Sequence, residues 1–208
     1  MAKETTNIGP KEISRPGCRI TYKAVFDFKK LYEFLHDWLL EEGYVVDGPP
    51  YYAPSNTKDM FETYYWERRT AQGFTDYIIQ WRLRKNPDDQ SSKWVDYKLA
   101  IDFLGLGITK TDVMHEGKKI GAYKGEINIE LTPKIILDPS TIWKKDTFLG
   151  KFASVFVGRT YKKEIKYHKE IVDEMMFRFE EAIKNFFGLS TFGEHGEPFH
   201  PEKGLGWA

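Results

Sequence analysis

The chain has a single cysteine, Cys18, among its 208 residues. One thiol cannot form an internal disulfide or a multi-cysteine zinc site, so neither kind of cross-link is expected to stabilise the fold. Lys and Arg total 31 and Asp and Glu total 31, so no overall field would attract nucleic acid. No apolar run approaches the roughly 20 residues of a membrane span, and the N-terminus lacks the apolar core of a secretory signal. We therefore expect a cytoplasmic protein with no transmembrane segment.

Recognisable catalytic motifs are also lacking. The chain has no glycine-rich phosphate loop, no GxSxG elbow and no paired-carboxylate signature. His195 and His200 lie close to glutamates, but Pro198 and Pro201 exclude the helix that could hold them at ligand spacing. We therefore predict no catalytic and no metal-binding residue, identify no cofactor, and favour a protein that is not an enzyme.

Aromatic residues, in contrast, are abundant: 15 Phe, 12 Tyr and 6 Trp make up 16% of the chain. Large rings commonly fill a sheet core. Tyr and Trp are also frequent in ligand pockets and at protein interfaces. The composition leaves both interpretations open.

The first half of the chain predicts a strand, a helix and a hairpin. Residues 19–26 alternate apolar and polar side chains, and Asp27 follows as a helix N-cap. Residues 28–42 carry an apolar stripe at helical spacing and end at Gly43. Period-two patterns over 59–69 and 75–85 then flank a short turn, which indicates an antiparallel hairpin.

The second half predicts long strands and a long helix. Strands are expected over 93–104, 107–115 and 119–137, with bends at Gly105, Gly107, Gly121 and Gly125. Residues 141–158 fit either a helix or a loop. From Tyr161 to Phe187, apolar residues recur every three or four positions, which predicts one helix of about 27 residues.

This order predicts an α+β fold: a curved antiparallel sheet of about five to seven strands wrapped on a long C-terminal helix. We expect a flexible N-terminal arm at 1–17, one domain at 18–188 and a C-terminal tail at 189–208. Over 19–187 the order of elements resembles the helix-grip arrangement of the lipid-transfer and plant-allergen-like superfamily. The resemblance is one of topology and implies a curved sheet that holds the helix.

A space between sheet and long helix could hold an apolar small molecule. The side chains expected to line such a pocket come from both elements: Trp81, Tyr97, His168, Met175 and Phe179. A histidine on an apolar helix face is more often a buried structural residue, so His168 has both interpretations.

A basic segment follows the predicted sheet. Between 144 and 169 eight Lys and Arg stand against two acidic residues, and aromatic residues lie among them. This pattern suits an anionic membrane or partner, and it also suits an ordinary solvated helix face. The residues predicted to contact an anionic partner are Lys144, Lys145, Lys151, Lys162 and Lys163. Because Arg is scarce among these basic residues, base-specific nucleic-acid binding is not expected.

The polar faces of the predicted strands interleave basic and acidic groups, namely Arg82, Arg84, Lys124, Glu126 and Glu130. This interleaving, after a strand–helix–strand opening, resembles the triphosphate tunnel enzymes and implies binding of a polyphosphate with Mg²⁺. The family's Glu-x-Glu-x-Lys signature is replaced here by Arg19, Thr21 and Lys23. Cross-strand ion pairs on a solvated face explain the same pattern.

We therefore predict a non-enzymatic binding or assembly module that uses an aromatic surface and the basic segment. A protein partner, a homo-oligomer or an anionic surface would suit it, and Phe192, Phe199 and Trp207 in the tail are available for docking. The alternatives are a carrier or enzyme that binds an apolar molecule between sheet and helix, and a triphosphate-processing enzyme.

Overall fold

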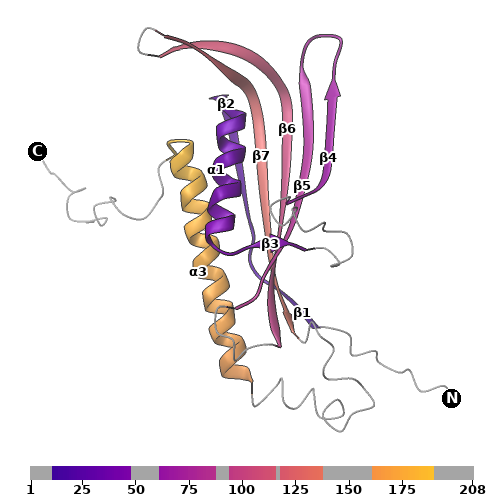
Figure 1. Cartoon of the computed structure of the whole chain (residues 1–208), viewed down its shortest axis with the longest axis vertical. Helices are drawn as coiled ribbons and strands as arrows, with labels where there is room; N and C mark the ends of the chain where they lie inside the picture. Colours follow the sequence, from indigo (N-terminus) through magenta and orange to yellow (C-terminus); the bar gives the residue numbers. More distant parts are fainter. Residues whose placement is uncertain (1–10, 48–60, 88–93, 116–117, 138–160, 190–208) are drawn as a thin grey trace, which may run out of the picture.

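A computed structural model describes residues 11–47, 61–87, 94–115, 118–137 and 161–189 (Figure 1). These residues form an α+β fold of one seven-stranded antiparallel sheet and two helices. The strands are β1 (Lys11–Ser14), β2 (Cys18–Phe26), β3 (Val45–Val46), β4 (Glu62–Arg69), β5 (Thr75–Lys85), β6 (Val95–His115) and β7 (Lys118–Leu137). The predicted α+β class and the curved antiparallel sheet are confirmed.

The sheet is built around its two longest strands. β7 pairs with β6 on one side and with β1 and β2, one after the other, on its second side. β5 pairs with β6, and β3 and β4 share the remaining edge of β5. The described sheet is therefore open, with β1 and β2 at one edge and β3 and β4 at the other.

Two details of the strands differ from the sequence predictions. Residues 11–14, placed in a flexible arm, form β1 and pair with the end of β7. Residues 95–115, expected as two strands, form the single strand β6. Gly107 lies in a bulge between Leu106 and Thr109 and has a φ of 61°, whereas Gly105 pairs with Ile127 of β7. The bulge absorbs the irregular residues, so pairing resumes beyond them and the strand bends without ending.

Helix α1 (Phe28–Glu41) begins where the sequence predicts and ends one residue before the predicted end at 42. The Asp27 side chain accepts a hydrogen bond from the Lys30 N–H at 3.1 Å, which satisfies a free donor of the first turn. Leu31, Leu35 and Leu39 are buried at helical spacing. Gly43, with a φ of 80°, then takes the left-handed conformation that favours glycine after a helix.

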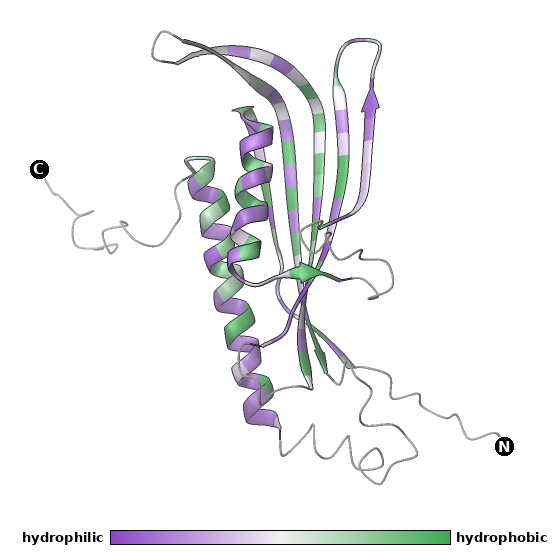
Figure 2. Cartoon of the chain, in the orientation of Figure 1, coloured by the Kyte–Doolittle hydropathy of each residue, from purple (hydrophilic) through white to green (hydrophobic). Residues whose placement is uncertain are grey.

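Helix α3 (Lys162–Phe186) lies on the same face of the sheet, side by side with α1 (Figure 1). Phe34 stacks on Phe186 and Trp38 stacks on Phe179, so the two helices run antiparallel. Figure 2 shows hydrophobic and hydrophilic residues alternating along β6 and β7, as expected for a sheet covered on one face. Within the described ranges, neither helix is long and apolar enough to cross a membrane.

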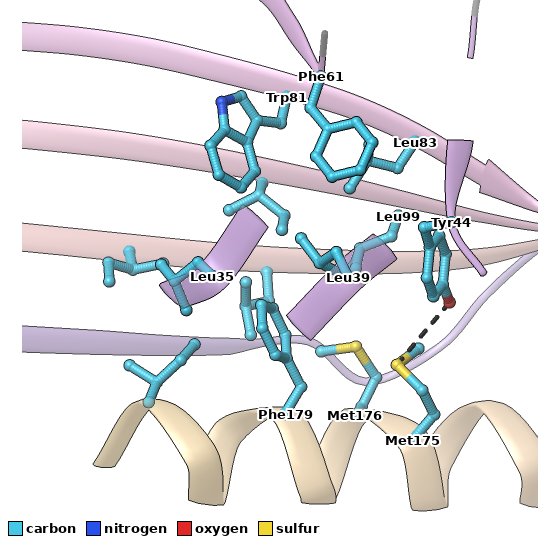
Figure 3. Close-up of a cluster of buried hydrophobic side chains, with 14 of the residues drawn as sticks. Leu35, Leu39, Tyr44, Phe61, Trp81, Leu83, Leu99, Met175, Met176 and Phe179 are labelled. Carbon is cyan, nitrogen blue, oxygen red and sulfur yellow. Dashed lines mark hydrogen bonds between the residues drawn. The ribbon is translucent and has the colours of Figure 1, made fainter. Parts of the chain in front are cut away.

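The core fills the space between the two helices and the sheet (Figure 3). Trp81 is fully buried and meets Tyr32, Phe61 and Phe103 edge-on at centroid distances of 4.8, 5.7 and 4.9 Å. Most of the abundant aromatic residues of the described chain contribute to this core, as the first interpretation of the composition expects.

Candidate functional site

A hollow in the described structure lies on the helix side of the sheet, beyond the start of α1. It measures about 590 Å³, and we call it the tyrosine groove. Strands β4, β5, β6 and β7 all contribute to it. Its lining residues are Glu67, Arg69, Gly73, Thr75, Tyr77, Ile108, Thr109, Lys110 and Tyr123.

The groove exists because the strands are much longer than the helix that covers them. β6 has 21 residues and extends over about 70 Å, whereas the 14 residues of α1 span only about 21 Å. Phe28, in the first turn of α1, stacks on Tyr77 at 5.3 Å and meets Tyr123 edge-on at 6.2 Å. Beyond Phe28 the tyrosines remain half-buried and face the groove.

A close backbone contact shapes the floor of the groove at the bulge. An added Cβ at Gly125 would lie 2.6 Å from the Ile108 side chain and 3.1 Å from the Gly107 carbonyl oxygen. The Gly107 N–H donates to an Asp76 carboxylate oxygen at 2.9 Å. The absence of a side chain at Gly125 therefore allows β6 and β7 to approach, and Ile108 becomes buried at the groove floor.

An ion pair of β4 forms one wall of the groove. The Arg69 Nε donates to Glu67 at 2.7 Å, and the Tyr65 hydroxyl donates to the other Glu67 oxygen at 3.2 Å. The Arg69 hydrogen bond is the main cause that lowers the pKa of Glu67, and Lys110 lowers it further. Glu67 is therefore ionised at neutral pH and neutralised by Arg69.

The remaining groups of the groove make it weakly cationic and rich in hydroxyls. Lys110 has no second carboxylate among the lining residues, so the lining carries one net positive charge. Burial raises the pKa of Tyr77. Burial, followed by the charge of Glu67, also raises the pKa of Tyr65, which lies next to the groove and donates to Glu67, to about 12. Both phenols stay neutral near pH 7 and act as hydrogen-bonding groups. This arrangement can hold an anionic group beside an aromatic surface.

The residues predicted to line a pocket between sheet and long helix fall into two groups. Tyr97, His168 and Met175 lie together, and the Tyr97 hydroxyl is 2.7 Å from His168 Nδ1. The Tyr44 hydroxyl donates to Met175 Sδ at 3.8 Å (Figure 3). Tyr97 and Met175 also line a small cavity of about 100 Å³ next to the charged side chains of Lys85, Glu42 and Arg178.

The other two predicted pocket residues lie elsewhere in the core. Trp81 packs under Tyr32 of α1, and its Nε1 donates to the Tyr32 hydroxyl at 3.2 Å. Phe179 is fully buried and stacks on Trp38 at 4.5 Å. The structure therefore does not bring all five residues around one cavity, and the space between α3 and the sheet is mostly filled by side chains.

The predicted anionic contact residues are only partly described. Lys162 and Lys163 are exposed in the first turn of α3. Lys144, Lys145 and Lys151 lie outside the described residues, as do both chain ends with their aromatic tail residues. The joint basic surface therefore stays a prediction.

The polar residues on the sheet face opposite the helices pair mainly with one another. Arg82 contacts Asp102 at 2.7 Å, Lys23 contacts Glu126 at 3.6 Å, and Arg19 pairs with Glu130. Because the described sheet is open, these groups do not line a tunnel. Cross-strand ion pairing accounts for them, and no set of three His, Cys, Asp or Glu within the described ranges could hold a metal ion.

Period-two alternation in the predicted strands 75–85 and 119–137 puts Tyr77 and Tyr123 on apolar faces, and no sequence pattern singles out Arg69 or Lys110. The lengths of the predicted strand and helix, compared with each other, do indicate an uncovered part of the sheet. A strand of 19 residues at 119–137 extends well beyond a 15-residue helix at 28–42, so part of the sheet face had to remain uncovered by that helix. Comparison with known proteins gives no further assignment: no family model matches the chain, and no curated protein matches it significantly.

Proposed function

We propose that the protein is a binding module whose tyrosine groove takes a small organic anion with an aromatic or apolar part. The observation that carries the proposal is the juxtaposition of Arg69 and Lys110 with the half-buried rings of Tyr77 and Tyr123 in a hollow of about 590 Å³. Charged donors fix the position of an anionic group, and the rings supply contact area. The helix-grip-like topology is part of this proposal and is supported by the long helix α3 packed on the curved sheet.

A polar groove is favoured over an apolar pocket between α3 and the sheet. The cavity at that position measures about 100 Å³, which is smaller than the pockets of about 300 Å³ or more that hold typical ligands. The tyrosine groove, at about 590 Å³, is larger than this minimum. It is open to solvent at the part of the sheet that lies beyond the start of α1.

Binding of matched probes measured by isothermal titration calorimetry tests this function. The probes are 2-naphthoate, its neutral analogue 2-naphthamide, and acetate. Naphthoate is expected to bind most tightly, because it presents both a carboxylate and a ring. Loss of a charge-assisted hydrogen bond costs about 1.5–3 kcal/mol, so naphthamide should bind at least about tenfold more weakly.

Three variants locate the site. R69Q and K110Q each remove a cationic donor of the groove and should weaken naphthoate binding by about tenfold or more. R68Q is the matched control, because Arg68 precedes Arg69 on β4 but lies opposite Asp76 on the other face of the sheet. Equal binding of naphthoate and naphthamide, or equal losses in R68Q and R69Q, would contradict the proposal.

A further inference from the structure

Strand β4 is an edge strand of the described sheet. It pairs with β5 from Glu62 to Arg69, and no other described strand lies along its second side. Seven of its eight residues are exposed. Such an edge presents a row of backbone donors and acceptors and is a template for another strand.

The backbone pattern shows which residues of β4 point outward. The Thr70 N–H donates to the Phe74 carbonyl at 2.8 Å, and the ladder continues with Arg69 opposite Thr75 and Arg68 opposite Asp76. Hydrogen-bonded and non-hydrogen-bonded pairs alternate along an antiparallel ladder. Tyr65, Glu67 and Arg69 therefore direct their backbone N–H and C=O groups away from β5.

β4 exposes aromatic side chains of the kinds that are frequent at protein interfaces. Tyr64, Tyr65 and Trp66 are 47, 50 and 37% exposed, and the strand contains no proline. The one irregularity, a bulge between Glu62 and Tyr64, leaves the stretch from Tyr64 to Arg69 in regular register. Aromatic residues are enriched at protein interfaces, and β4 lacks the proline that blocks pairing at many edge strands of monomeric proteins.

The side chains of β4 on the sheet face away from the helices suit an antiparallel pair of two copies. Tyr64, Trp66 and Arg68 share this face. A two-fold axis at Glu67 would oppose two glutamates. An axis at Trp66 opposes the two tryptophans and places Tyr64 against Arg68, where a cation–π contact can form.

We propose that β4 is a dimerisation edge that pairs antiparallel with β4 of a second copy about a two-fold axis at Trp66. The two sheets then join into one, with both tyrosine grooves on the same side. Trp66 and its symmetry mate occupy a non-hydrogen-bonded position, where cross-strand side chains are closest. This interface is independent of any ligand in the groove.

Sedimentation velocity over a concentration series tests the dimer. Wild type is expected to shift from monomer to dimer as concentration rises. W66K should stay monomeric, whereas F177K should dimerise like wild type, because Phe177 is exposed on α3, 66% accessible, and remote from β4. Y65P removes an outward N–H that β5 does not use. If edge pairing forms the dimer, Y65P should be monomeric and still folded by circular dichroism, whereas non-specific association through exposed aromatic side chains would persist.

Cysteine pairing tests the register. In a C18S background, an axis at Trp66 puts residue 64 of one copy opposite residue 68 of the other. A mixture of Y64C and R68C should therefore oxidise to a mixed disulfide, and Y64C alone should not. A wild type that is monomeric at every concentration, a dimeric W66K, or a Y64C homodisulfide in place of the mixed one would each overturn the proposal.

Discussion

Replacing Phe179 with alanine tests the packing of α3 on the rest of the fold. Phe179 is fully buried and stacks on Trp38 of α1 at a centroid distance of 4.5 Å and an interplanar angle of 26°. Truncating a buried Phe to Ala costs about 3–5 kcal/mol, and a stacked pair contributes about 0.5–1.5 kcal/mol beyond its area. We expect F179A to lower the free energy of unfolding by about 4 kcal/mol.

Phe177 supplies the matched control on the same helix. It is 66% exposed, so F177A should change the free energy of unfolding by no more than about 0.5 kcal/mol. Both variants gain the same helix propensity from alanine, so their difference isolates the lost packing.

Urea unfolding followed by far-ultraviolet circular dichroism measures both free energies. The slope m should not change, because both variants unfold from the same fold. In thermal unfolding, 4 kcal/mol corresponds to a loss of about 8–16 °C for a domain of this size. A loss below about 1 kcal/mol for F179A, or equal losses for both variants, would refute the packing of α3 described above.

Three further outcomes are expected. G125V should destabilise the fold by about 1–3 kcal/mol in urea unfolding, because a Cβ there lies 2.6 Å from the Ile108 side chain. G121A should cost little, because a Cβ at Gly121 meets no described atom within 4 Å. Similar losses in the two variants would argue against the bend at the bulge. Burial, followed by the charge of Glu180, raises the pKa of Cys18 to about 12. Its alkylation by iodoacetamide should therefore be slow at pH 8 and accelerate about tenfold per pH unit up to pH 10, and a plateau near pH 9 would show an ordinary thiol. If the predicted basic surface binds anionic partners, wild type should sediment with anionic vesicles at low salt. A variant with Glu in place of Lys144, Lys145, Lys151, Lys162 and Lys163 should not sediment with them. Equal sedimentation of the two proteins would show that these lysines do not bind the vesicles.

Local patterns predicted the elements that bury one regular face. Asp27 marked the start of α1, and the alternation through Ile79, Trp81 and Leu83 marked the buried face of β5. The seam position of His168 correctly indicated a buried helix residue, with 1% exposure. In each case the signal lies within a few residues, because helix and strand periods are local properties.

Features that depend on distant partners were not predictable from local patterns. β1 is short and polar, and its position follows from pairing with β7 and from contacts such as Lys134 with Glu12 at 3.1 Å. Arg15 likewise pairs with Asp173, 158 residues away. The tyrosine groove depends on where α1 begins relative to β6 and β7, and the alternation of Tyr77 and Tyr123 is the same whether a helix covers them or not.

The position of β7 next to β2 has a consequence for how the chain acquires its structure. Ile20 lies opposite Ile129, so the first long strand cannot find its neighbour until more than a hundred further residues have been made. At about 5–20 residues per second, this interval lasts about 5–20 s on the ribosome. Contacts so far apart in sequence also slow folding of the complete chain. During that interval β2 lacks both its strand partner β7 and the covering helix α3, so its apolar side is exposed in the nascent chain and prone to aggregation.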